Sequence, residues 1–86
     1  MNWTLVITGP ARKELRNLSA KDLERVRKAL RDMECNPFGG DIVHLQMHPA
    51  AWRRRVGNYR IFFDVDPAQA VVVVTSILRR TSTTYR

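Results

Sequence analysis

The chain concentrates arginine between Trp52 and Phe63. This stretch reads WRRRVGNYRIFF and holds four arginines and no acidic residue. An arginine guanidinium stays protonated and can donate two parallel hydrogen bonds to a phosphate. Such side chains, gathered on one surface without carboxylates, are suited to binding a phosphate or another anion. The stretch therefore predicts an anion-binding site.

The same stretch predicts a β-hairpin whose turn is Gly57-Asn58. Two runs of strand-forming residues flank this pair, and glycine at the first central position suits two-residue hairpin turns. The facing pairs are then Val56 with Tyr59, Arg55 with Arg60, Arg54 with Ile61, and Arg53 with Phe62. Side chains alternate between the faces of a strand, so Arg54 lies on the mostly apolar face. The opposite surface, called the arginine face below, comprises Arg53, Arg55, Arg60 and Phe62.

The composition is typical of one small domain that binds nucleic acid. The 86 residues form a single domain, 1–86, with a net charge of +7 and a sequence pI of about 10.8. All seven basic residues after position 34 are arginines, against three acids. The single cysteine, Cys35, excludes an internal disulfide. We find no signal peptide, and the longest apolar run, Ala70–Val74, is too short to span a bilayer, so we expect a cytoplasmic location.

The remaining patterns predict the elements that support the hairpin. Residues 2–8 alternate as a strand, residues 10–18 and 19–35 carry apolar side chains at helical spacing, and residues 70–78 are continuously β-branched. Residues 42–45 are too few to assign. The expected fold is α+β, in the order β-α-α-β-β-β, with an antiparallel four-stranded sheet and a helical hairpin on one face. The arginine face would be the open side of that sheet.

Two residues near the C-terminus are further candidates for this surface. Arg80 shares strand parity with Ser76 and Val74 and follows a predicted central strand. Tyr85 would place a phenol at the same site, or it is a terminal aromatic that packs into the core or frays. The spacing leaves both interpretations of Tyr85 open.

Neither a metal nor a cofactor is expected. His44, His48 and Cys35 are the soft metal-ligand candidates, and no recognised ligand spacing joins them. The carboxylates are few and scattered, and the chain has no phosphate-binding loop and no dinucleotide motif. Chemistry at an arginine-rich surface would therefore depend on the guanidinium groups and on the substrate itself.

Cleavage of RNA is a reaction that such a surface suits. The attacking 2′-hydroxyl belongs to the substrate, so the protein has only to hold it in line and to stabilise charge that develops on the phosphate. Arginine cannot act as a general base. Tyr85 or His44 would take that role, or the reaction would proceed largely by electrostatics. Phe62 is the candidate for stacking an unpaired base, and we also expect RNA contacts from His44 and Arg79.

These residues resemble the RelE/ParE superfamily of bacterial toxins, specifically its RelE-like branch. The segment Trp52–Ile61 is similar to the family's aromatic-R-I-R-V-G-D-Y-R segment, and Arg79-Arg80 followed by Tyr85 is similar to its terminal basic-R…Y pattern. The resemblance covers nearly the whole chain. Two departures from the pattern are Arg54, which replaces an apolar residue, and Met47, which stands where a glycine is common.

The resemblance implies a metal-independent endoribonuclease that cuts mRNA in the ribosomal A site and is neutralised by an antitoxin. By position, Arg53 and Arg55 match a basic pair at the scissile phosphate, and Arg60 and Arg80 match arginines that stabilise the transition state. Tyr85 resembles a terminal catalytic aromatic. The antitoxin would be acidic and partly disordered when free, and would form a hetero-oligomer with this chain. The alternatives are a ParE-like DNA gyrase poison, which needs no nuclease site, and a non-catalytic RNA-binding relative.

Overall fold

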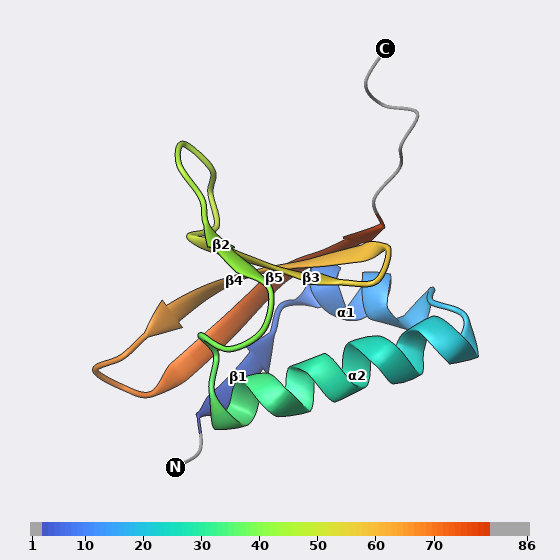
Figure 1. The fold of residues 1–86 in the computed structure, drawn as a ribbon, viewed down its shortest axis with the longest axis horizontal. Helices are drawn as coiled ribbons and strands as arrows, with labels where there is room; N and C mark the ends of the chain where they lie inside the picture. Colours follow the sequence, from blue (N-terminus) through green and yellow to red (C-terminus); the bar gives the residue numbers. More distant parts are fainter. Residues whose placement is uncertain (1–2, 80–86) are drawn as a thin grey trace.

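The computed structural model describes residues 3–79 as two helices and one five-stranded sheet. Both helices lie on one side of the sheet (Figure 1). No helix among the described residues is long and apolar enough to cross a membrane. In chain order the elements are β1 (Thr4–Ile7), α1 (Gly9–Arg16), α2 (Ala20–Cys35), β2 (Ile42–His44), β3 (Trp52–Val56), β4 (Tyr59–Asp66) and β5 (Val71–Arg79).

The sheet has the order β1-β5-β4-β3-β2, so the predicted antiparallel four-stranded sheet is wrong in two respects. Residues 42–44 form a fifth strand, paired antiparallel to β3. β1 runs parallel to β5, with Thr4 beside Val71 and Ile7 beside Val74. The direction of β1 depends on the path through both helices and three later strands, which the local pattern of residues 2–8 does not encode. The α+β class and the meander of β3, β4 and β5 are confirmed.

The core lies between the helices and the sheet, as the apolar stripes predicted. Val26, Ala29, Leu30 and Met33 of α2 are buried against Ile61 and Phe63 of β4 and Val72, Val74 and Ile77 of β5. Thr8 and Ser19 cap the two helices, because each side-chain oxygen accepts a hydrogen bond from a backbone N–H in the first turn. The helical hairpin therefore covers one face of the sheet and leaves the other face open.

The β3–β4 hairpin has the predicted register. Arg53 faces Phe62, Arg55 faces Arg60 and Val56 faces Tyr59. Gly57 has a φ of 57°, which is the left-handed value that a two-residue hairpin turn requires at its first central position. The arginine face therefore forms on the side opposite the buried Ile61 and Phe63.

A bulge in β5 alters the predicted parity of that strand. Phe62 is paired with Ser76 and Phe63 with Val74, so Thr75 is the extra residue. Ser76 therefore shares the arginine face, whereas Val74 is buried in the core. The expectation that Ser76 and Val74 share one face is wrong, because strict alternation holds only without an inserted residue. Arg80 and Tyr85 lie outside the described residues.

Beyond the end of β1, helix α1 contacts the edge of β5. The last β1 residue, Ile7, lies beside Val74, so the rest of β5 has no strand on that side. Glu14 of α1 accepts hydrogen bonds there from the backbone N–H of Ile77 at 2.8 Å and from the Ser76 hydroxyl at 3.3 Å. The carboxylate thus satisfies a buried donor and holds the end of β5 in the sheet.

The loop from Leu45 to Ala51 contains a strained residue. Met47 has a φ of 53° and a fully exposed side chain. This left-handed conformation costs a residue with a Cβ roughly 1 kcal/mol or more, whereas glycine adopts it freely. Position 47 is therefore one at which the backbone favours glycine over methionine.

Replacing Met47 with glycine should stabilise the protein. The exposed side chain contributes no packing, so relief of backbone strain should outweigh the added chain entropy of the unfolded state. We expect Met47→Gly to raise the free energy of unfolding by about 0.5–1 kcal/mol in urea denaturation. Met47→Ala is the control, since it keeps the Cβ and should give no gain. Equal stabilisation by both variants would contradict the strain argument.

Candidate functional site

The arginine face carries two guanidinium groups with unsatisfied buried donors. Arg53 on β3 and Arg60 on β4 are both half-buried, and the Nε of each is buried without a hydrogen-bond partner among residues 3–79. An unsatisfied buried donor costs roughly 1–3 kcal/mol, and more when it is charged. Neither guanidinium forms an ion pair within residues 3–79. Two strong donors on the open face of the sheet therefore lack an acceptor that an anionic ligand could supply.

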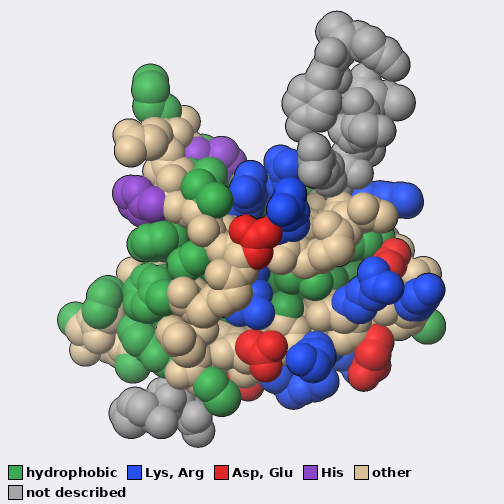
Figure 2. Space-filling view, in the orientation of Figure 1, with side chains coloured by type: hydrophobic (Ala, Val, Ile, Leu, Met, Phe, Trp, Pro, Cys, Tyr) green, Lys and Arg blue, Asp and Glu red, His purple; other side chains and the backbone are tan. Residues whose placement is uncertain are grey.

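The third arginine of this face is partly neutralised. The Nε of Arg55 lies 3.0 Å from a carboxylate oxygen of Asp41, and the Arg55 side chain is 47% exposed. The backbone carbonyl of Asp41 also accepts a hydrogen bond from the Arg55 N–H, at 2.9 Å. The aspartate therefore holds Arg55 in place and offsets its charge, but it pairs with neither of the other two arginines of the face. Figure 2 shows one group of basic side chains in the upper part of the molecule, near the histidines, and others spread over its right and lower parts.

Sequence reasoning missed His48 as part of this surface. The imidazole stacks on Phe62 with 5.0 Å between the ring centroids and 13° between the ring planes. The loop is tied down by Asp64 of β4, whose Oδ1 accepts a hydrogen bond from the Ala51 N–H at 2.7 Å. His48 comes from an irregular segment without periodicity, so no sequence signal predicted the face on which its ring would lie.

Two other predicted RNA contacts lie on the opposite, helix-facing side of the sheet. His44 is paired with Trp52, and their rings meet edge-on with centroids 4.7 Å apart. Arg79 is paired with Tyr59, which shares its face with the buried Ile61. The structure therefore brings together Arg53, Arg55, Arg60 and Phe62, and does not bring His44 or Arg79 to them.

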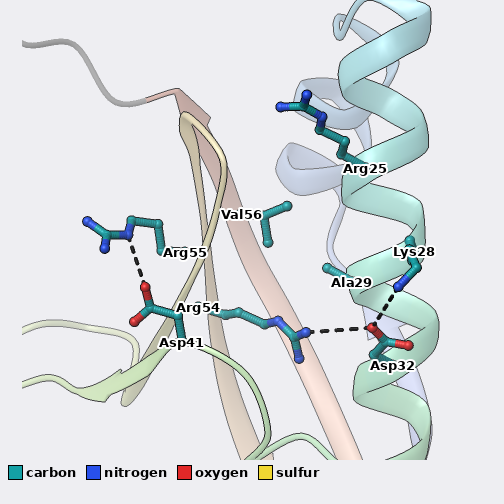
Figure 3. Close-up of a pocket in the computed structure, with 8 residues that line it drawn as sticks. All are labelled: Arg25, Lys28, Ala29, Asp32, Asp41, Arg54, Arg55 and Val56. Atoms are coloured by element: carbon teal, nitrogen blue, oxygen red, sulfur yellow. Dashed lines mark hydrogen bonds and ion pairs between the residues drawn. The ribbon is translucent and has the colours of Figure 1, made fainter.

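A second basic region lies in a cleft of about 270 Å³ between α2 and β3 (Figure 3). Arg54 extends from β3 across this cleft, with its side chain only 12% exposed, and lies 3.7 Å from Asp32 on α2. It also donates a hydrogen bond to the Gly39 carbonyl at 3.2 Å. Lys28 lies 4.0 Å from the same aspartate. Asp32 therefore offsets part of the positive charge of this cleft, whereas Arg25, which also lines it, forms no ion pair within residues 3–79.

Tyr59 links the hairpin to the start of α2. Its hydroxyl donates a hydrogen bond to Asp22 at 3.1 Å. Burial raises the pKa of the Tyr59 phenol above its usual 10.0, and the Asp22 carboxylate raises it further, while Arg79 opposes both effects. The neutral phenol is therefore the form that holds the turn of the arginine hairpin against the helix.

The arrangement can bind a phosphate and stabilise negative charge developing on it. Within residues 3–79, no three side chains of histidine, cysteine, aspartate or glutamate are grouped so as to hold a metal ion. The reactive groups that the structure describes on this face are guanidinium donors, with a flat aromatic stack beside them.

Comparison with known proteins identifies one matching family. The profile of the family described as "ParE toxin of type II toxin-antitoxin system, parDE" matches residues 5–83. No curated protein matches the chain significantly.

Several solved structures have a similar fold. The archaeal RelE–RelB complex from Pyrococcus horikoshii gives a TM-score of 0.83 at 20% identity, covering 96% of this chain and 100% of that one. The RelBE2 toxin–antitoxin complex from Mycobacterium tuberculosis gives a TM-score of 0.81 at 24% identity, covering 93% of this chain and 100% of that one. The YoeB/ParE toxin from Agrobacterium tumefaciens gives a TM-score of 0.74 at 20% identity, covering 91% of this chain and 99% of that one. At these identities the likeness establishes the fold.

The Tyr59 hydrogen bond should make the free energy of unfolding fall as the pH becomes alkaline. Folding raises the pKa of the Tyr59 phenol. The phenol's contribution to the free energy of unfolding is therefore complete below pH 10.0 and is lost as the pH rises through the raised pKa. We expect Tyr59→Phe to unfold about 1 kcal/mol more easily at pH 7. Urea denaturation between pH 7 and pH 11 should then show a shallower alkaline decline for the variant than for the wild type. Parallel declines would rule out this role.

Proposed function

The chain belongs to the ParE toxin family of type II toxin–antitoxin systems, within the RelE/ParE superfamily, and we propose that it is a metal-independent endoribonuclease. Its substrate would be mRNA in the ribosomal A site, and its cleavage would inhibit translation. The observation that carries this proposal is the pair of half-buried arginines, Arg53 and Arg60, whose Nε donors have no partner in the part of the chain that the structure describes. A gyrase poison would have no need of such a pair on the open face.

The proposed reaction is an internal transesterification. The 2′-hydroxyl oxygen of one nucleotide attacks the adjacent phosphorus, and the bond from phosphorus to the 5′-oxygen of the next nucleotide breaks. The products are a 2′,3′-cyclic phosphate and a 5′-hydroxyl, with one proton moved from the 2′-oxygen to the leaving oxygen. No added oxidant, reductant or water is consumed. The protein has to align these atoms and to stabilise the charge on the five-coordinate phosphorus.

The arginines divide this work by position. Arg53 and Arg55, on β3, would hold the non-bridging oxygens of the scissile phosphate. Arg60 faces Arg55 across the hairpin and would stabilise the charge that grows in the transition state. Because guanidinium groups do not release protons, they act as donors and positive charges only. Arg80 and Tyr85 keep their proposed roles, at the transition state and as the catalytic phenol, from the family resemblance alone.

A DNA gyrase poison is the second candidate, because the matching family is described by ParE. The same fold serves toxins named RelE and a toxin named YoeB/ParE, so the fold does not decide between the two activities. Induction of the toxin would separate them. A gyrase poison would cause DNA damage with intact mRNA, and a ribonuclease would leave mRNA cut within codons.

We propose an antitoxin as the physiological partner. Two of the similar structures are complexes of a toxin with its antitoxin. The net charge of +7 and the unpaired arginines favour an acidic partner segment that folds as it binds. Such a segment would neutralise the toxin by covering the arginine face.

Removal of Arg60 should abolish cleavage. Loss of one preorganised charge donor typically costs 10²–10³-fold in rate, and we expect roughly that loss for Arg60→Ala on translated mRNA mapped by primer extension. Arg31→Ala is the matched control, since it removes the same charge from an exposed position on α2 and should cut within about twofold of wild type. Arg60→Lys should recover only part of the rate, because lysine lacks the planar fork.

Two outcomes would contradict the proposal. If purified toxin leaves mRNA intact on translating ribosomes, the chain is not a ribonuclease of this kind. If Arg60→Ala and Arg31→Ala cut equally well, the cleavage site lies away from the arginine face.

A further inference from the structure

His48 and Phe62 form a parallel aromatic stack on the arginine face, with the ring planes 13° apart. The other aromatic contacts among residues 3–79 are edge-on. The His44–Trp52 rings are inclined by 63° and the Phe38–Trp52 rings by 72°. A nearly parallel stack with an exposed outer member presents a flat ring surface to solvent. Such a surface is what a planar ligand can stack on.

Backbone hydrogen bonds hold the His48 ring in this orientation. The Ala50 N–H donates to Nδ1 of His48 at 3.0 Å, so Nδ1 carries no proton while that bond is made. At the loop ends, the Leu45 N–H donates to the Ala51 carbonyl and the Ala51 N–H donates to Asp64. The ring is therefore positioned before any ligand arrives, which lowers the entropy lost on binding.

The stack lies next to the groups that would hold phosphate. Phe62 faces Arg53 across the hairpin and follows Arg60 by two residues on the same face of β4. His48 is exposed, whereas Phe62 beneath it is half-buried, so the imidazole is the member of the stack that a ligand can reach. A nucleotide whose phosphate contacts Arg53 therefore has its base close to this ring.

We infer that His48 stacks an unpaired base of the RNA and positions the nucleotide against Arg53 and Arg60. This inference rests on the proposed function. The occupant is a nucleobase because the surface is flat, aromatic and flanked by phosphate-binding donors, which is the combination that single-stranded nucleic acids require. His48 is thus a positioning residue of the substrate site.

Two substitutions separate the ring from its role in the loop. His48→Asn removes the ring but keeps an oxygen that can accept the hydrogen bond from the backbone N–H two residues on. His48→Phe keeps an aromatic ring that can stack and removes the acceptor. If His48 stacks a base, the phenylalanine variant should bind RNA nearly normally and the asparagine variant should not.

The assay uses ribosomes programmed with an mRNA that is 2′-O-methylated through the A-site codon, so that binding is measured without cleavage. We expect His48→Asn to weaken binding of the full-length toxin by about tenfold, the typical loss of one stacked base. His48→Phe should stay within about threefold of the wild type. Replacing one A-site nucleotide by an abasic nucleotide should weaken wild-type binding and bring wild type and His48→Asn to the same affinity.

The outcomes are decisive in both directions. Equal affinities of wild type and His48→Asn, or loss in His48→Phe but not in His48→Asn, would overturn the stacking role while leaving the proposed nuclease intact. The stacking role would also be overturned if His48→Asn still bound more weakly than the wild type to every mRNA that carries a single abasic nucleotide in the A-site codon. Cleavage of unmethylated mRNA by the wild type is tested in parallel, and its absence would mean that the proposed function itself has failed.

Discussion

The register of the β3–β4 hairpin is the constraint on which the functional surface depends. The left-handed φ at Gly57 closes a two-residue turn, and the turn decides which side chains of β4 face the helices. A slip of one residue would bury Arg60 and Phe62 and would expose Ile61 and Phe63. Burying an unpaired guanidinium costs free energy, whereas burying isoleucine stabilises the fold. The apolar core therefore enforces the arrangement of the arginines on the other face.

Neighbouring arginines on β3 have different surroundings because side chains alternate along the strand. Arg54 points toward α2, where its guanidinium forms an ion pair with Asp32, and it donates a hydrogen bond to the Gly39 carbonyl in the loop that follows. Gly40 leaves room for this side chain, since a Cβ there would lie 2.7 Å from the Arg54 Cζ. Arg53, one residue earlier, lies on the open face, and no described residue accepts a hydrogen bond from its Nε. The same residue type therefore ties a loop to a helix at one position and stays available to a ligand at the next.

Local features of the fold could be predicted from the sequence, and features that depend on distant segments could not. The hairpin register follows from residues within the hairpin, and the buried stripe of α2 follows from its own periodicity. The parallel direction of β1 depends on where β5 lies, and the bulge at Thr75 depends on a fit between two strands. The site was predictable to the same extent. The placement of Arg53, Arg55 and Arg60 on one face followed from the hairpin pattern, whereas His48 reaches Phe62 through a loop whose path no pattern encodes.

The parallel pairing of β1 with β5 has a consequence for synthesis of the chain. β5 lies between β1 and β4, yet it follows both of them in the sequence and is the last of the five described strands to be made. Ile61 and Phe63 pair with Ile77 and Val74, so the inner side of the arginine hairpin lacks its partners until β5 has left the ribosome. A hairpin without those neighbours is marginally stable at best. The arginine face is therefore held in place only after residues 71–79 have been synthesised, although the arginines that form it are made earlier.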